Sequence, residues 1–188
     1  MNLALIQPRV SFQEYLDGEK TSDVRHEYLA GQVHAMAGAG ESHNRIALNI
    51  AFHLRAATRG KPCGVFINDM KLRVAHADSF YYPDVLVTCD PLDTEPFYKQ
   101  FPCLVVEVLS PSTEATDRRE KLAAYRALPS MHHYLLAAQD QRRIEWHRRD
   151  VHDRWIMAVL EGGGVIDLEC HALKVSLSLD DVYEDVAL

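Results

Sequence analysis

The sequence predicts an α/β fold in which helices flank a mixed β-sheet and antiparallel segments form a C-terminal extension. Helix-forming and strand-forming stretches follow one another along all 188 residues, which favours a fold that mixes both elements. The regular strand–helix alternation of a doubly wound dinucleotide-binding fold is missing. A glycine-rich phosphate loop and a G-x-S-x-G nucleophile elbow are missing too. These absences argue against a dinucleotide-binding fold, a phosphate-binding loop and the serine nucleophile of an α/β-hydrolase.

The first third of the chain predicts a short helix, a hairpin and a long helix. In "SFQEYLDGE", Ser11 and Glu14 have the spacing of a capping box. The stretch "RHEYLAGQVHAMAG" is typical of a hairpin that turns near Gly31. The stretch "ESHNRIALNIAFHLRAATRG" indicates a long helix capped at Ser42 and ended by Gly60.

Strands dominate the remainder of the chain. Strand-forming residues between Cys63 and Asp90 are broken only by "AHADS", which predicts two strands, "GVFINDMKLRV" and "YYPDVLVTC". The apolar run "FPCLVVEVL" predicts the next strand, and a helix over about residues 113–128 should end at Pro129. The stretches "HHYLLAA", "RRIEWHRR" and "RWIMAVLE" then indicate antiparallel strands.

Length and composition predict one domain over residues 1–188, because a chain of this size can build one sizeable core. Hydrophobic residues make up 47% and charged residues 25%, as in ordinary soluble proteins. No apolar stretch approaches the roughly 20 residues that a membrane span requires. The first residues, "MNLALIQPRV", lack the features of a secretory signal. We therefore expect a cytoplasmic protein that has no membrane partner.

The cysteines Cys63, Cys89, Cys103 and Cys170 lie far apart in the sequence, without a C-x-x-C pair. This spacing indicates neither a zinc site nor a disulfide framework. We expect four reduced thiols that are packed in the interior.

The net charge of −7 argues against a surface coated with positive potential, so contact with nucleic acid must be local. One basic run consists of Arg142, Arg143, Arg148 and Arg149. It could contact phosphates or simply form an exposed hairpin.

Two acidic residues stand in apolar strands. Glu107 lies within "FPCLVVEVLSPST", and Asp84 follows Pro83 directly before "VLV". A buried carboxylate persists only when a cation, a metal or several hydrogen bonds compensate it. A hard divalent ion such as Mg²⁺ needs one or two carboxylates completed by water and substrate. The pair therefore predicts a metal site, although each acid could also be an ordinary ion-pair or turn residue.

The helix after the Glu107 strand carries Asp117, Lys121 and Tyr125 on one face. A lysine on this face can lean toward the sheet. Its charged neighbours, residues 118–120, also fit an ordinary solvated helix face.

Together these features resemble the Uma-two family of putative restriction endonucleases, a branch of the PD-(D/E)xK nuclease superfamily. The resemblance rests on "PD" at Pro83–Asp84, "EVLSPST" at Glu107–Thr113 and the "D…K…Y" set of the following helix. It also includes "HEYLAGQV", the long helix led by His43 and the closing "VSLSLDDVYED". One departure stands out: the position two residues after Glu107, where the superfamily has its lysine, is Leu109.

The resemblance implies a restriction-endonuclease-like fold and hydrolysis of DNA phosphodiester bonds with Mg²⁺ or Mn²⁺. It implies that Asp84 and Glu107 bind the metal, together with the main-chain carbonyl of Val108. Lys121 would take the place of the missing strand lysine and orient the attacking water. Glu27 would help to position a water or a second metal, or else only pair across strands.

Two other function classes stay open. A catalytically silent nuclease-fold domain could act in protein or nucleic-acid interaction, for example as a homodimer. The pair Asp84 and Glu107 could also serve a glycosidase, but the scattered aromatic residues do not suggest a sugar-binding cleft. His43 at a helix start fits a structural hydrogen bond better than a ligand role.

Overall fold

The structure is a computed structural model that describes residues 9–188. The predicted lack of a secretory signal concerns residues 1–10, most of which lie outside this range. Within the described part of the chain, no helix is long and apolar enough to cross a membrane.

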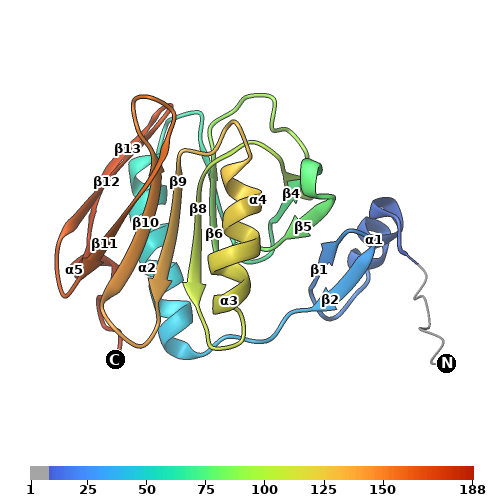
Figure 1. The fold of residues 1–188 in the computed structure, drawn as a ribbon, viewed down its shortest axis with the longest axis horizontal. Helices are drawn as coiled ribbons and strands as arrows, with labels where there is room; N and C mark the ends of the chain where they lie inside the picture. Colours follow the sequence, from blue (N-terminus) through green and yellow to red (C-terminus); the bar gives the residue numbers. More distant parts are fainter. Residues whose placement is uncertain (1–8) are drawn as a thin grey trace.

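A six-stranded mixed sheet forms the centre of the molecule (Figure 1). Its order is β11-β10-β9-β8-β6-β3. Strands β8 and β9 run parallel, and the other neighbours are antiparallel. The predicted mixed sheet is therefore confirmed. The strands are β3 (Gly64–Ile67), β6 (Val85–Thr88), β8 (Pro102–Leu109), β9 (His133–Ala138), β10 (Arg143–Arg149) and β11 (Trp155–Glu161).

Helices cover both faces of this sheet, as Figure 1 shows. The long helix α2 (Glu41–Ala57) packs on one face. The other face meets one helical segment made of α3 (Glu114–Thr116), η2 (Asp117–Lys121) and α4 (Leu122–Arg126). Successive strand residues point to opposite faces, so Val85 packs with the α2 side while Leu86 packs with the α4 side.

A five-stranded sheet lies beside the central sheet, in the order β2-β1-β5-β4-β7. The short helix α1 (Phe12–Glu19) begins with the predicted capping box of Ser11 and Glu14. The predicted hairpin turns at Ala30 and Gly31. The strands are β1 (His26–Leu29), β2 (Gln32–Ala35), β4 (Lys71–Val74), β5 (Ser79–Tyr81) and β7 (Tyr98–Lys99), with the 3₁₀ turn η1 (Ala75–Ala77) between β4 and β5.

The predicted C-terminal extension is an antiparallel pair, β12 (Val165–Cys170) and β13 (Leu173–Ser178), followed by α5 (Leu179–Val182). This pair packs on the core at the α2 side. In Figure 1 it lies at the opposite end of the molecule from α1 and the β1–β2 hairpin.

Two local predictions were wrong. The cap of α2 is Gly40, and Ser42 instead lies inside the helix and donates its hydroxyl to the carbonyl of Ala187, 3.1 Å away. The stretch predicted as two strands contains the four strands β3 to β6. Asn68 adopts a left-handed backbone conformation with φ of 47°, which ends β3 within the first predicted strand. The second predicted strand is interrupted between Tyr81 and Val85, where Pro83 stands.

The prediction of four reduced thiols was also wrong, because two disulfides, Cys63–Cys89 and Cys103–Cys170, join all four cysteines. Antiparallel pairing of β3 with β6 brings the first two cysteines together. The second disulfide fastens β12 to β8 across 67 residues of sequence. Such neighbours arise from strand pairing and packing, which cysteine spacing alone does not encode.

Candidate active site

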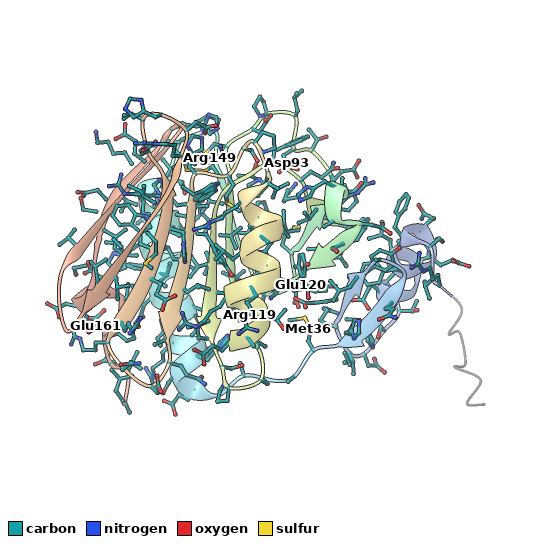
Figure 2. All side chains as sticks on the ribbon, in the orientation of Figure 1. Met36, Asp93, Arg119, Glu120, Arg149 and Glu161 are labelled. Atoms are coloured by element: carbon teal, nitrogen blue, oxygen red, sulfur yellow. A yellow bond between two sulfur atoms is a disulfide. The ribbon has the colours of Figure 1, made fainter. Side chains whose placement is uncertain are left out.

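A cleft of about 860 Å³ opens between the β1–β2 hairpin, the ends of β6 and β8, and the helical segment from α3 to η2. The acidic residues singled out in the sequence line this cleft. Figure 2 labels two further lining residues, Met36 and Glu120, which lie between the hairpin and the helical segment. The cleft is large enough to admit a substrate group together with water.

Asp84 enters the cleft directly before β6. Because Val85 pairs with Val106 in the antiparallel ladder, Asp84 comes opposite Glu107 on the neighbouring strand β8. The main-chain N–H of Val108 donates to Asp84 Oδ2 at 2.7 Å. His43 Nε2 lies 2.9 Å from Asp84 Oδ1 and donates its proton, since the carboxylate can only accept. Two donors therefore hold the carboxylate in one orientation.

Lys121 reaches the same cleft from a π-helical turn. Residues Asp117–Lys121 form this turn inside an otherwise α-helical segment, a feature that is frequent at functional sites. The ammonium Nζ lies 3.1 Å from Glu27 Oε1, 3.2 Å from Glu107 Oε1 and 3.1 Å from Asp117 Oδ1. Only 5% of the Lys121 side chain is exposed, so the reading of a solvated helix face does not hold.

Glu107 is buried, and its carboxylate has two donors on one oxygen. Oε1 accepts from Lys121 Nζ and from the hydroxyl of Tyr125, which lies 3.1 Å away. Both donors come from the helical segment and both approach Oε1. This arrangement leaves Oε2 without a donor among these neighbours.

The charges in the cleft do not balance. Burial raises the pKa of the Glu107 carboxyl well above its usual range; Lys121 opposes this rise. The carboxylates of Asp117, Asp84 and Glu27 raise that pKa further by repulsion. Burial lowers the pKa of Lys121, but attraction to Glu107, Glu27 and Asp117 outweighs burial and holds it well above its usual range. Around Glu107, the ammonium of Lys121 therefore stands among the carboxyl groups of Glu107, Glu27, Asp117 and Asp84.

The donor set fits a hard divalent cation in part. Carboxylate oxygens from neighbouring strands and a nearby main-chain carbonyl are ligands that Mg²⁺ or Mn²⁺ accepts. Across residues 9–188, no three His, Cys, Asp or Glu side chains form a ready metal cage. A cation bound here would therefore complete its shell with water and substrate oxygens, as Mg²⁺ commonly does.

Comparison with known proteins places the chain in a family. A family model described as "Putative restriction endonuclease", Uma2, matches residues 12–180. The chain belongs to the Uma2 family. Two relatives of this Uma2 chain occur in Synechocystis, where they are described as the uncharacterized proteins slr1290 and sll1609. The first is 32% identical over 96% of this chain and 94% of its own length. The second is 33% identical over 86% of this chain and 93% of its own length.

A solved structure shares the fold. It is described as a putative nuclease belonging to DUF820, from Anabaena variabilis, and superposes with a TM-score of 0.71 at 16% sequence identity. The match covers 93% of this chain and 97% of that one. The fold of this Uma2 chain is thus the fold of a known structure, and the predicted restriction-endonuclease-like class is confirmed.

The residues predicted for the Uma2 site come together in the structure. Asp84, Glu107, Lys121, Glu27 and Val108 all line the cleft. The hydrogen bond expected for His43 is confirmed, and its partner is the carboxylate of Asp84 in the cleft. The sequence placed His43 at the start of a long helix, and this position was the feature that could have indicated a contact with the cleft.

The basic run lies elsewhere. Its members occupy β10 or the residue before it and do not line the cleft. Arg142 pairs with Asp180, Arg143 pairs with Glu145 and Glu161, and Arg149 pairs with Asp153. These pairs favour an ion-paired hairpin over a phosphate-binding stripe, although the four arginines are half-buried and not exposed as the alternative prediction had them.

Proposed function

We propose that this Uma2 protein is a metal-dependent endonuclease that hydrolyses phosphodiester bonds in DNA. Family membership supports a nuclease activity in general. One observation carries the proposal further. The lysine that is missing from the strand after Glu107 is supplied by Lys121, whose ammonium lies 3.2 Å from the Glu107 carboxylate.

Asp84 and Glu107 would hold Mg²⁺ or Mn²⁺, joined by the main-chain carbonyl of Val108. A divalent cation at this place lowers the pKa of a bound water and offsets charge on the phosphate. Supporting this assignment, Asp84 and Glu107 come from paired strands and face one cleft. Glu107 also keeps one carboxylate oxygen, Oε2, without a protein donor among its neighbours Lys121 and Tyr125.

The protein groups around these acids have separate tasks. Lys121 would orient the attacking water and stabilise the anionic transition state. Glu27 would help to position a water or a second metal, and it also holds the Lys121 ammonium at a distance of 3.1 Å. His43 would keep Asp84 in the orientation that a cation requires, because hydrogen bonds to a ligating carboxylate fix its geometry.

Cleavage assays test the proposal. Supercoiled plasmid, linear duplex and single-stranded DNA are incubated with the protein and Mg²⁺ or Mn²⁺. Cleavage by the wild type should require the metal, stop with a chelator, and be absent in Asp84→Asn. Metal-independent cleavage, or cleavage by Asp84→Asn equal to wild type, would contradict the proposed site.

A catalytically silent domain is the second candidate. The observation that favours it is the pairing of Lys121 with three carboxylates, which satisfies the ammonium without any substrate. Under this alternative the wild type binds DNA or a protein partner but cleaves none of the DNA forms with either metal.

A further inference from the structure

A second buried polar cluster adjoins the cleft through Tyr82 and is centred on Glu19 at the C-terminal end of α1. Only 3% of the Glu19 side chain is exposed. Its Oε2 accepts from the hydroxyl of Tyr82 at 2.6 Å and from the main-chain N–H of His26 at 3.3 Å. Its Oε1 lies 2.8 Å from Nδ1 of His26. None of these three residues has a part in the chemistry proposed above.

Both partners of Glu19 are chain neighbours of site acids. His26 directly precedes Glu27 on β1, and Tyr82 stands two positions before Asp84. The N–H of Tyr82 also points at Glu27 Oε1 over 3.4 Å. One carboxylate thus ties together two segments that come from different parts of the sequence and that each carry an acid of the cleft.

The residue between Tyr82 and Asp84 makes this tie effective. Pro83 has a fixed φ and also restricts the backbone of the residue before it. Few conformations are therefore open to the chain between a fixed Tyr82 and Asp84. Tyr82 itself is 2% exposed, and the ammonium of Lys71 lies 5.2 Å from the centre of its ring, so the anchoring side chain has little room to move.

An apolar side chain could fill the volume of Glu19 without the desolvation cost of a buried carboxylate. Burial would raise the pKa of the Glu19 carboxyl, but the hydrogen bonds from Tyr82 and His26 outweigh burial and lower it. Glu19 is therefore a buried carboxylate anion whose oxygens are satisfied by three directional contacts, two from His26 and one from Tyr82. Directional contacts define positions more narrowly than packing alone does.

We propose that Glu19 is a positioning residue that acts through Tyr82 and His26 to hold Asp84 and Glu27 in register across the cleft. This role rests on the proposed metal-dependent activity of that cleft. Partners that orient first-shell ligands typically change metal affinity or activity by about 10–100-fold when removed. The same range is expected here.

The test compares Tyr82→Phe, Glu19→Ala and Glu19→Gln with wild type and with the control Tyr28→Phe. The control removes a hydroxyl from a tyrosine of β1 that is 3% exposed and whose partner, Asp78, lies outside the cleft. Glutamine can keep the contacts of Glu19, since its oxygen accepts from Tyr82 and the His26 N–H while its amide donates to His26 Nδ1. Mn²⁺ affinity is measured by calorimetry, kcat and KM by DNA cleavage, and folding by melting curves.

Tyr82→Phe and Glu19→Ala should weaken Mn²⁺ binding and lower kcat by about 10–100-fold, with KM for DNA little changed. Glu19→Gln should remain near wild type, and Tyr28→Phe should match wild type. Because the two residues act through one hydrogen bond, the double variant Glu19→Ala/Tyr82→Phe should be no worse than Glu19→Ala alone.

Three results would overturn the role. Tyr82→Phe could equal Tyr28→Phe in Mn²⁺ affinity and kcat while wild type binds and cleaves, which removes the positioning role and leaves the proposed function intact. Glu19→Gln could lose as much as Glu19→Ala, which shows that charge and not hydrogen-bonded position matters. A wild type that neither binds Mn²⁺ nor cleaves removes the proposed function and this role with it. If Glu19→Ala does not fold, Tyr82→Phe and Glu19→Gln still decide.

Discussion

Lys121 Nζ and Glu107 Oε1 lie 3.2 Å apart although 14 residues separate them in the chain. In an E-x-K motif the lysine would be on the same strand face as the acid, two residues on, where this chain has Leu109. Lys121 instead lies at the end of a π-helical turn, and this turn directs its ammonium back to the Glu107 strand. The site therefore keeps an acid–lysine contact while drawing the two groups from different elements.

Lys121→Ala should abolish DNA cleavage, because the variant lacks the group assigned to the attacking water and the transition state. Mn²⁺ binding should survive, since the lysine is not a metal ligand. The metal-free variant should lose on the order of 3–5 kcal/mol of unfolding free energy, as buried carboxylates are left without their cation. Cleavage assays, calorimetry and melting curves measure these effects.

Arg119→Ala is the matched control for Lys121, because Arg119 is a neighbouring residue of the same helical segment but is exposed (Figure 2). It should cleave and melt like wild type. If Lys121→Ala also cleaves normally, the assigned lysine is wrong.

Asp84→Asn should lose Mn²⁺ binding, because the site then keeps only one of its two strand carboxylates. Asp90→Asn is the control: Asp90 follows the other end of β6 and does not line the cleft. Calorimetric titration with Mn²⁺ should give wild-type affinity for Asp90→Asn and no measurable heat for Asp84→Asn. Equal binding by both variants would remove Asp84 from the metal site.

Glu107→Gln should abolish cleavage yet leave the metal-free protein as stable as wild type or slightly more stable. Lys121 keeps Glu27 and Asp117 as partners, so the substitution does not strand its charge. It also removes repulsion between Glu107 and the other site acids. A fall of about 3–5 kcal/mol in unfolding free energy would instead identify Glu107 as a purely structural ion-pair residue.

The same variant tests the raised pKa of Glu107. The folded protein binds the Glu107 proton up to a higher pH than the unfolded chain does. Protonated Glu107 therefore stabilises the fold fully below the usual glutamate pKa, and this contribution is lost as pH rises toward the raised pKa of the folded state. In excess chelator, the stability advantage of Glu107→Gln over wild type should therefore grow from pH 4.5 to neutral pH. A constant difference over this range would speak against the raised pKa.

Acid should destabilise the protein through His133. Burial lowers the pKa of His133 to about 4. The neutral ring accepts from Trp146 Nε1 at 3.2 Å and lies 3.0 Å from the carbonyl of Glu169. Because the pKa of His133 is lower in the folded protein than in the unfolded chain, neutral His133 contributes its full stabilisation above about pH 6.5. That contribution is lost as pH falls through about 4.

The expected loss from His133 is on the order of 3 kcal/mol. Denaturant titrations at pH 7 and pH 4 should show a smaller acid-induced loss in His133→Asn than in wild type. The exposed His152 supplies the control, and His152→Asn should behave as wild type. An unchanged acid response in His133→Asn would remove His133 as its source.

Reduction of the disulfides should lower stability. The bond Cys103–Cys170 closes a loop of 67 residues, so its loss should cost on the order of 4 kcal/mol of unfolding free energy. Thiol titration of the denatured, unreduced protein should find no free thiol, and the Cys103→Ser/Cys170→Ser variant should melt earlier than wild type. Finding four free thiols before reduction would contradict the disulfides and support the reduced cysteines that the sequence spacing predicted.

The sequence by itself determined the elements whose signals are local. Strand β8 follows from its continuous apolar run, and the start of α1 follows from Ser11 and Glu14, because side-chain period and capping act within a few residues. Glu107 was recognisable from its immediate neighbours too, because an acid within an apolar strand loses its hydration and needs a partner that compensates the charge. The family pattern added which partner to expect.

Tertiary structure alone decided which groups meet. By sequence, Lys121 fits a solvated helix face as well as a buried one, and only packing of the helical segment against the sheet and β1 buried it, while its neighbours Arg119 and Glu120 stayed exposed. Ser42 fits a helix cap by residue type, yet its hydroxyl instead donates to the Ala187 carbonyl 145 residues away in the chain. The pairing of the cysteines and the contact of Glu19 with Tyr82 likewise join distant positions. Contacts of this kind depend on how whole elements pack, and a linear pattern does not carry that information.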